Sequence, residues 1–184
     1  MKLSNAVLAL SSFALSAHAA DCTGPNQSVF SDAAVQMMWS IRAWACPNVW
    51  WQSVTVVPDG AWCDAGGGIV GAYWGTWTLS GVQSEQQCWD ITEEIINQCM
   101  WYDFASTSYN GGSWSYGGIY AGGWFWGDNT RSCVHPVKRG EEVEEIEGPT
   151  NFTLADGTIH KVDKQVWLKI TEDGATVVRE ETYV

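Results

Sequence analysis

Residues 111–129 read GGSWSYGGIYAGGWFWGDN, a stretch in which glycine pairs alternate with large rings and a single residue is charged. The rings are either the core of a small β unit or a platform exposed to a ligand. Side chains alternate between the two faces of a strand, so residues of equal parity share a face. One continuous strand would therefore gather five even-numbered rings on one face: Trp114, Tyr116, Tyr120, Trp124 and Trp126.

The same stretch also fits a β-hairpin, because Gly117–Gly118 can form a two-residue turn. Tyr116 would then pair with Ile119, and the rings after the turn would point to the face opposite Trp114. Only the continuous strand, or a bulged one, makes a single platform of all five rings. The sequence leaves both arrangements open.

Residues 1–19 are predicted to be a signal peptide. Lys2 supplies the positive end, an apolar run from Ala6 to Leu15 follows, and Ala17-His18-Ala19 gives the small-x-small cleavage pattern. The apolar run is too short to span a bilayer, and no second run of spanning length follows. We therefore expect a secreted, extracellular protein without a transmembrane segment.

All cysteines follow the predicted cleavage site: Cys22, Cys46, Cys63, Cys88, Cys99 and Cys133. An even number in an exported chain indicates disulfides, so we expect three of them. The sequence contains no Cys-x-x-Cys pair and no histidine cluster of the kind that binds metal, so no metal or cofactor is expected. Two of these cysteines, Cys88 and Cys99, lie three turns apart on a predicted helix, about 16 Å along its axis. A disulfide needs Cα atoms within about 7 Å, so these two should not pair. Each should instead join the helix face to the sheet, and the other pairings stay open.

The charge and the tryptophans divide the chain. The formal net charge is −12, which disfavours partners with phosphate backbones or anionic headgroups, so no nucleic acid is expected. Twelve of the 13 tryptophans precede residue 127. We predict a Trp-rich disulfide domain over residues 20–139 and an acidic β tail over residues 140–184. The pair Lys138-Arg139 at the boundary is either a dibasic processing site or part of a charged linker.

Two helices are expected in the domain. Ser31 can cap the first, whose apolar residues recur at helical spacing until Pro47 ends it. Ser84 and Gln87 form a capping box at the start of the second. Four residues of that second helix share one face: Cys88, Ile91, Ile95 and Cys99.

The rest of the chain is predicted to be β structure. One strand carries alternating apolar residues on a single face, namely Ile69, Tyr73, Trp77 and Leu79. In the tail, the turn Asp173–Gly174 separates two strand-like runs that predict a hairpin. This tail is too small to be stable alone, so it should dock on the domain or be a removable pro-segment. The predicted fold class is α+β: a disulfide-stapled antiparallel sheet packed with two helices, plus a small C-terminal β unit.

Few residues could carry catalysis. The histidines are poorly placed and the cysteines are expected to be paired, so a nucleophile–base site has little to draw on. A carboxylate pair is the remaining enzymatic option. A glycoside hydrolase needs two carboxyl groups that flank the sugar. Asp103 and Asp128 lie on either side of the aromatic stretch in the sequence and are the candidates. Acids near turns are ordinary, so a non-catalytic protein is preferred. Asn26 and Asn151 begin N-glycosylation sequons.

The segment QCWDITEEIINQC, followed by GGSWSYGGIYAGGWFW, resembles a pattern in small secreted fungal proteins, the necrosis-inducing effectors and the related killer-toxin-like proteins. In that group a Cys-bearing helix is followed by a Gly-Trp strand in a disulfide-stapled α/β sandwich. The similarity covers Cys88 to Cys99 and Gly112 to Trp126. It implies a non-enzymatic factor that acts on a host or competitor cell surface, and it carries over no catalytic residues.

The function expected from the sequence is recognition of a cell-surface or cell-wall component, a glycan or a receptor, through exposed rings among residues 114 to 126. Indole faces stack on the C–H-rich faces of sugars and bury much area. The alternatives are a membrane-damaging killer-type toxin and a small glycoside hydrolase that uses an aspartate pair.

Overall fold

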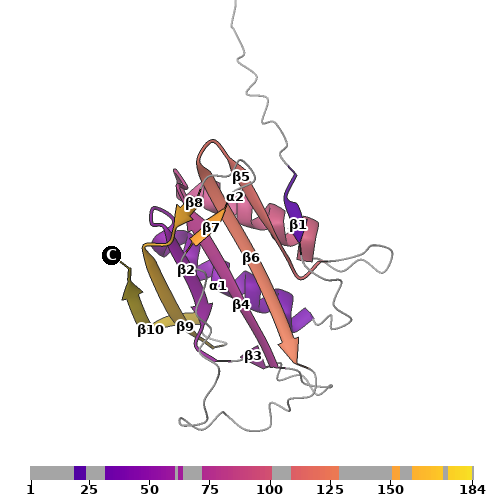
Figure 1. The fold of residues 1–184 in the computed structure, drawn as a ribbon. Helices are drawn as coiled ribbons and strands as arrows, with labels where there is room; N and C mark the ends of the chain where they lie inside the picture. Colours follow the sequence, from indigo (N-terminus) through magenta and orange to yellow (C-terminus); the bar gives the residue numbers. More distant parts are fainter. Residues whose placement is uncertain are drawn as a thin grey trace, which may run out of the picture.

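The computed structural model describes residues 19–23, 32–60, 62–63, 72–100, 109–128, 151–153, 159–171 and 174–183. These residues confirm the α+β class, with helices packed against an eight-stranded sheet (Figure 1). The helices are α1 (Asp32–Val49), α2 (Glu85–Ile95) and the π-helical turn η1 (Ile96–Met100). The strands are β1 (Asp21–Thr23), β2 (Val54–Pro58), β3 (Trp62–Cys63), β4 (Ala72–Ser80), β5 (Gly111–Tyr116), β6 (Ile119–Asp128), β7 (Asn151–Thr153), β8 (Ile159–Lys161), β9 (Lys164–Thr171) and β10 (Gly174–Thr182).

The main sheet has the order β1-β5-β6-β4-β2-β9-β10, and β3 pairs with β4 beside this path. Its pairings are antiparallel except for β2 and β9, which run parallel. The strands β7 and β8 form a separate two-stranded sheet. Both helices lie on the same side of the main sheet, behind it in Figure 1, so the sheet has a helix face and an outer face.

The alternation predicted for β4 is confirmed in the part that the structure describes. Tyr73, Trp77 and Leu79 are buried on the helix face, and the indole N–H of Trp77 donates to the carbonyl of Met38 over 2.9 Å. Between them, a Cβ on Gly75 would lie 2.6 Å from the ends of two methionine side chains of α1. Glycine at this position lets the helix pack close to the strand. The fourth residue of the predicted face, Ile69, lies outside the described residues.

The helix α1 ends at Val49, two residues beyond the end predicted at Pro47. Proline this close to a C-terminus forfeits a single backbone hydrogen bond of the last turn, so the helix tolerates it. The Asn48 side chain also donates to the Trp44 carbonyl over 2.8 Å, which satisfies one of the terminal carbonyls. The proposed cap Ser31 is outside the described residues.

The capping box predicted at the start of α2 is present in part. The backbone N–H of Gln87 donates to Ser84 Oγ over 3.1 Å. Its reciprocal bond is displaced by one residue, because Gln87 Oε1 accepts from the backbone N–H of Gln83 over 2.8 Å. The first bond satisfies a donor that a helix start would otherwise leave unpaired, and the second satisfies the N–H of the residue that precedes the cap.

Two disulfides join the described cysteines: Cys22–Cys99 and Cys46–Cys88, with Cα–Cα distances of 5.1 and 5.5 Å. The prediction that Cys88 and Cys99 do not pair is confirmed. Cys99 joins the helix layer to β1, as expected, but the prediction that Cys88 also reaches the sheet is wrong. It bonds to α1 instead, because the two helices lie next to each other. The side chain of Cys63 and the whole of Cys133 lie outside the described residues.

The C-terminal hairpin β9–β10 is part of the main sheet. β9 pairs with β2 over five residues, from Val54↔Lys164 to Pro58↔Leu168. Val166 and Leu168 are fully buried in the same hydrophobic core as the helices. The pair Lys138-Arg139 and the sequon residue Asn26 lie outside the described residues, whereas Asn151 begins β7.

No helix in the described part of the chain is both long enough and apolar enough to cross a membrane.

Candidate functional site: an aromatic ledge on the outer face

Residues 111–128 form the hairpin β5–β6. Gly117 and Gly118 have φ values of 59° and 83°, a conformation suited to a two-residue turn, and Tyr116 pairs with Ile119. Of the two arrangements left open by the sequence, the structure shows the hairpin. A single platform of five rings is therefore not formed.

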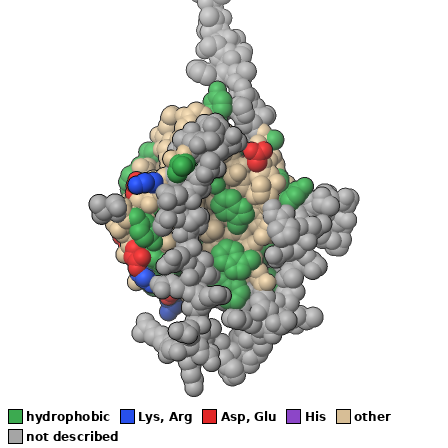
Figure 2. Space-filling model, in the orientation of Figure 1, with side chains coloured by type: hydrophobic (Ala, Val, Ile, Leu, Met, Phe, Trp, Pro, Cys, Tyr) green, Lys and Arg blue, Asp and Glu red, His purple; other side chains and the backbone are tan. Residues whose placement is uncertain are grey.

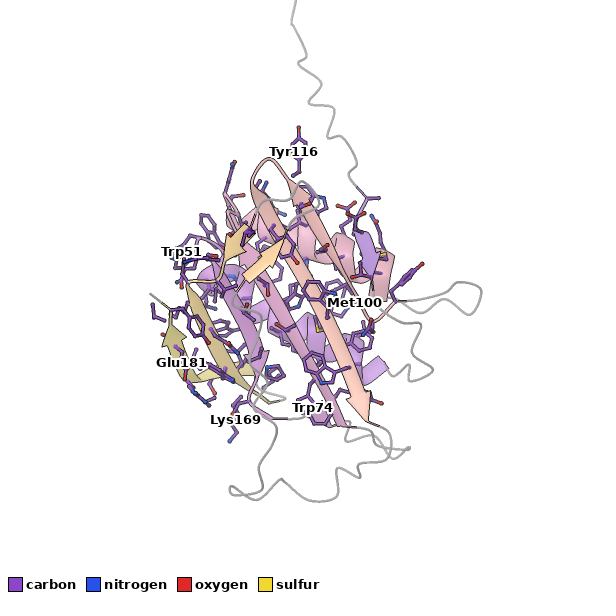
Figure 3. All side chains as sticks on the ribbon, viewed as in Figure 1. Trp51, Trp74, Met100, Tyr116, Lys169 and Glu181 are labelled. Atoms are coloured by element: carbon purple, nitrogen blue, oxygen red, sulfur yellow. A yellow bond between two sulfur atoms is a disulfide. The ribbon has the colours of Figure 1, made fainter. Side chains whose placement is uncertain are left out.

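The turn sends the candidate rings to two different faces. Trp114 and Tyr116 have the parity of the helix face: Trp114 packs against the core, and Tyr116 is 58 % exposed at the hairpin tip (Figure 3). Tyr120, Trp124 and Trp126 have the parity of the outer face. Tyr120 is buried there, whereas Trp124 and Trp126 are half-buried.

A further tryptophan joins them from the neighbouring strand. Trp74 of β4 pairs directly with Trp126 and is also half-buried. We call Trp74, Trp124 and Trp126 the outer ledge. Figure 2 views this face and shows hydrophobic side chains set among backbone and other side chains, with an acidic side chain farther toward the top of the view. Figure 3 places Trp74 beside the C-terminal end of β6.

Trp124 lies flat on a floor of glycines. A Cβ on Gly111 would lie 2.2 Å from Cδ1 of Trp124, and a Cβ on Gly122 would lie 2.5 Å from its Cη2. The five-membered ring therefore covers β5 and the six-membered ring covers β6 itself. The indole N–H donates to Thr23 Oγ1 over 3.2 Å, which fixes the ring in its plane. A ring held this way presents one face to the sheet and the other outward.

The margin of the outer ledge is polar, and it includes one described acidic residue, because the exposed Asp21 of β1 pairs with Ser113 and so shares its face. Ser113 and Ser115 of β5 share its face and are half-buried. The described side chains of β4, β5 and β6 include no charged group. Burial raises the pKa of Tyr120 above its ordinary value, so this phenol stays neutral. Its hydroxyl oxygen would lie 2.4 Å from a Cβ on Gly122 and so borders the floor under Trp124. Such a surface disfavours an anionic ligand and can accept a neutral one.

Two tryptophans on the helix side, Trp39 and Trp89, are engaged differently. The Arg42 guanidinium lies between two indoles, 4.5 Å from the ring centre of Trp39 and 4.7 Å from that of Trp89. It also donates to Thr92 Oγ1, to the Trp89 carbonyl and to Glu93 Oε2. Burial lowers the pKa of Arg42, and Glu93 opposes this shift. These two rings make cation–π contacts with the buried Arg42, and the contacts join α1 to α2.

The carboxylates considered for catalysis are not brought together by any described geometry. Asp103 lies outside the described residues, and for Asp128 only the position at the end of β6 is described. Among the described residues, no group of His, Cys, Asp or Glu side chains could hold a metal ion.

Sequence reasoning missed Trp74 and Trp51. Trp74 could have been found from the parity of β4, since it alternates with the buried Tyr73 and Trp77 and must face the other way. Trp51 follows α1, packs edge-on against Trp50 and is 57 % exposed. No periodic signal marks a residue in such a turn.

Comparison of the chain with protein-family models, with curated proteins and with solved structures finds no match.

Proposed function

We propose that this is a secreted, non-catalytic recognition protein that binds a glycan of a cell surface or cell wall with its outer ledge. The observation that carries the proposal is the position of Trp124, held flat on glycines with its N–H bonded to Thr23. Trp74 and Trp126 extend the aromatic surface across two paired strands.

A preorganised ring favours the stacking of a sugar. The C–H-rich face of a pyranose packs on an indole, and the area covered is buried from water. A ring that is already fixed loses little conformational entropy on binding. The described side chains of β4, β5 and β6 carry no charge, which suits a neutral polysaccharide, whereas the nearby Asp21 and the net charge of −12 disfavour an anionic one.

The test is binding to a glycan array and to insoluble cell-wall polysaccharides. The double variant Trp124→Ala/Trp126→Ala removes two rings of the outer ledge. Tyr116→Ala/Trp51→Ala is the matched control, since it removes two exposed rings that lie outside the outer ledge. We expect the first variant to lose binding by about tenfold or more and the control to keep it.

Two outcomes would contradict the proposal. One is that no glycan or polysaccharide binds the wild-type protein. The other is that both double variants bind as wild type does. Release of reducing sugar from a bound polysaccharide would show instead that the protein is an enzyme.

A further inference from the structure

A pocket of about 290 Å³ lies on the helix side of the sheet, between α1 and the hairpin β9–β10. Ile170 and Ala175 are direct partners across that hairpin and pack against the core. One face of α1 supplies the opposite wall. The described residues that line it are Ser40, Ala43, Trp44, Asn48, Ile170, Gly174 and Ala175.

The lining combines one indole with neutral polar groups. Trp44 is half-buried, with part of its ring against the core and part in the pocket. Among the described lining residues none is charged. The described lining residues would give a charged ligand no partner in exchange for lost hydration. These residues therefore favour an uncharged ligand.

The hydrogen bonds already made define what the polar groups can still offer. Ser40 donates its hydroxyl hydrogen to the Gln36 carbonyl over 2.9 Å. Asn48 uses one N–H on the Trp44 carbonyl over 2.8 Å. The remaining capacity is the Ser40 oxygen as an acceptor, and the Asn48 amide as an acceptor and a donor. A ligand hydroxyl, which both donates and accepts, matches this set.

The size of the pocket limits the ligand. Its volume lies at the lower end of the range of about 300–1,000 Å³ that is usual for small-molecule sites. One six-membered ring is the scale that fits, and Trp44 offers the flat apolar surface on which the face of such a ring can stack.

We propose that this helix-side pocket binds a single neutral pyranose, a monosaccharide or the terminal residue of a glycan. The ring stacks on Trp44, and its hydroxyls bond to Ser40 and Asn48. The site is separate from the outer ledge, because the sheet lies between them. It does not depend on the function proposed for that ledge.

The experiment is a titration of the full chain with the methyl glycosides of glucose, mannose, galactose and N-acetylglucosamine, followed by ligand-observed NMR. We expect at least one glycoside to bind at millimolar concentration. Ala175→Leu fills the pocket and should abolish that binding. Asn48→Ala removes an exposed amide at the cost of one hydrogen bond to a carbonyl at the end of α1, and should weaken binding by about fivefold.

Two controls separate this site from the outer ledge and from a nonspecific tryptophan contact. Trp124→Ala and Trp51→Ala should bind the glycoside as wild type does, while Trp124→Ala tests the polysaccharide binding proposed above. The pocket proposal is overturned if no glycoside binds or if Ala175→Leu still binds. Loss of glycoside binding in Trp124→Ala alone would also overturn it. So would binding of the cation tetramethylammonium in place of the neutral sugars.

Discussion

The indole N–H of Trp124 donates to the hydroxyl of Thr23 over 3.2 Å, across the strand that separates them. The register places the two residues in one row, since Thr23 pairs with Gly111 and Gly111 pairs with Trp124. The ring can cross β5 because the residue between them has no side chain. A glycine in the middle of the row therefore determines where the aromatic surface lies.

The glycine floor can be tested with Gly122→Ala. The added Cβ would meet two side chains, Trp124 Cη2 at 2.5 Å and Tyr120 Oη at 2.4 Å, so the ring must tilt while the backbone can stay. We expect polysaccharide binding to fall about tenfold for a cost in stability of about 1 kcal/mol. Binding assays and urea unfolding give the two numbers.

The matched control for this change is Ser113→Ala, because Ser113 lies directly opposite Gly122 on the same face. It should bind and unfold as wild type does. Equal binding by Gly122→Ala and wild type would show that the flat position of the ring does not matter.

The helix layer depends on Arg42. Arg42→Met keeps much of the volume but removes both cation–π contacts and the bonds to Thr92, to the Trp89 carbonyl and to Glu93. We expect the free energy of unfolding to fall by about 2 kcal/mol, because the lost contacts outweigh the relief of burying a charge. Thermal and urea unfolding measure the change.

The comparison for Arg42 is Arg179→Met. Arg179 also stacks on an indole, 4.4 Å from the ring centre of Trp167, but its side chain is 47 % exposed and its partner Glu181 is solvated. Its loss should cost less than about 1 kcal/mol. If both variants lose the same stability, the buried position of Arg42 between two indoles has no special role.

Burial of Tyr120 predicts a dependence of stability on pH. The pKa of Tyr120 is raised in the folded protein, so the unfolded chain loses this proton at a lower pH than the folded chain does. The contribution to stability is complete below the unfolded pKa of about 10 and declines as pH rises above it. Urea unfolding at about pH 8 and about pH 11 should show this decline in wild type and a smaller one in Tyr120→Phe. Identical slopes would contradict the assignment.

Local signals explain which parts of the fold could be predicted. The capping box at Ser84 and the parity of Tyr73, Trp77 and Leu79 depend on neighbours within one element. The partner of Cys88 could not be predicted, because it depends on how the two helices pack. The same holds for the parallel pairing of β2 with β9, whose paired residues lie 110 positions apart. The ledge was predicted in part: Trp124 and Trp126 lie in it, but the turn at Gly117–Gly118 removed Trp114 and Tyr116, and Trp74 came from another strand.

The position of β9 predicts what cleavage near the dibasic pair would do. Residues 140–184 contain no cysteine, so only noncovalent contacts can hold them after a cut. β9 buries Val166 and Leu168 and pairs with β2, so we expect the cleaved hairpin to stay bound. A specific protease site inserted after Arg139, followed by size-exclusion chromatography, tests this. Separation of the two pieces in native buffer would indicate a removable pro-segment.

The most direct test of the central claim is hydroxyl-radical footprinting of the intact protein, free and bound to the polysaccharide identified by the array. If the outer ledge is the contact surface, Trp74, Trp124 and Trp126 become protected, while the exposed reference Trp51 stays reactive. Protection that spares all three ledge residues, or that falls equally on Trp51, would contradict the account.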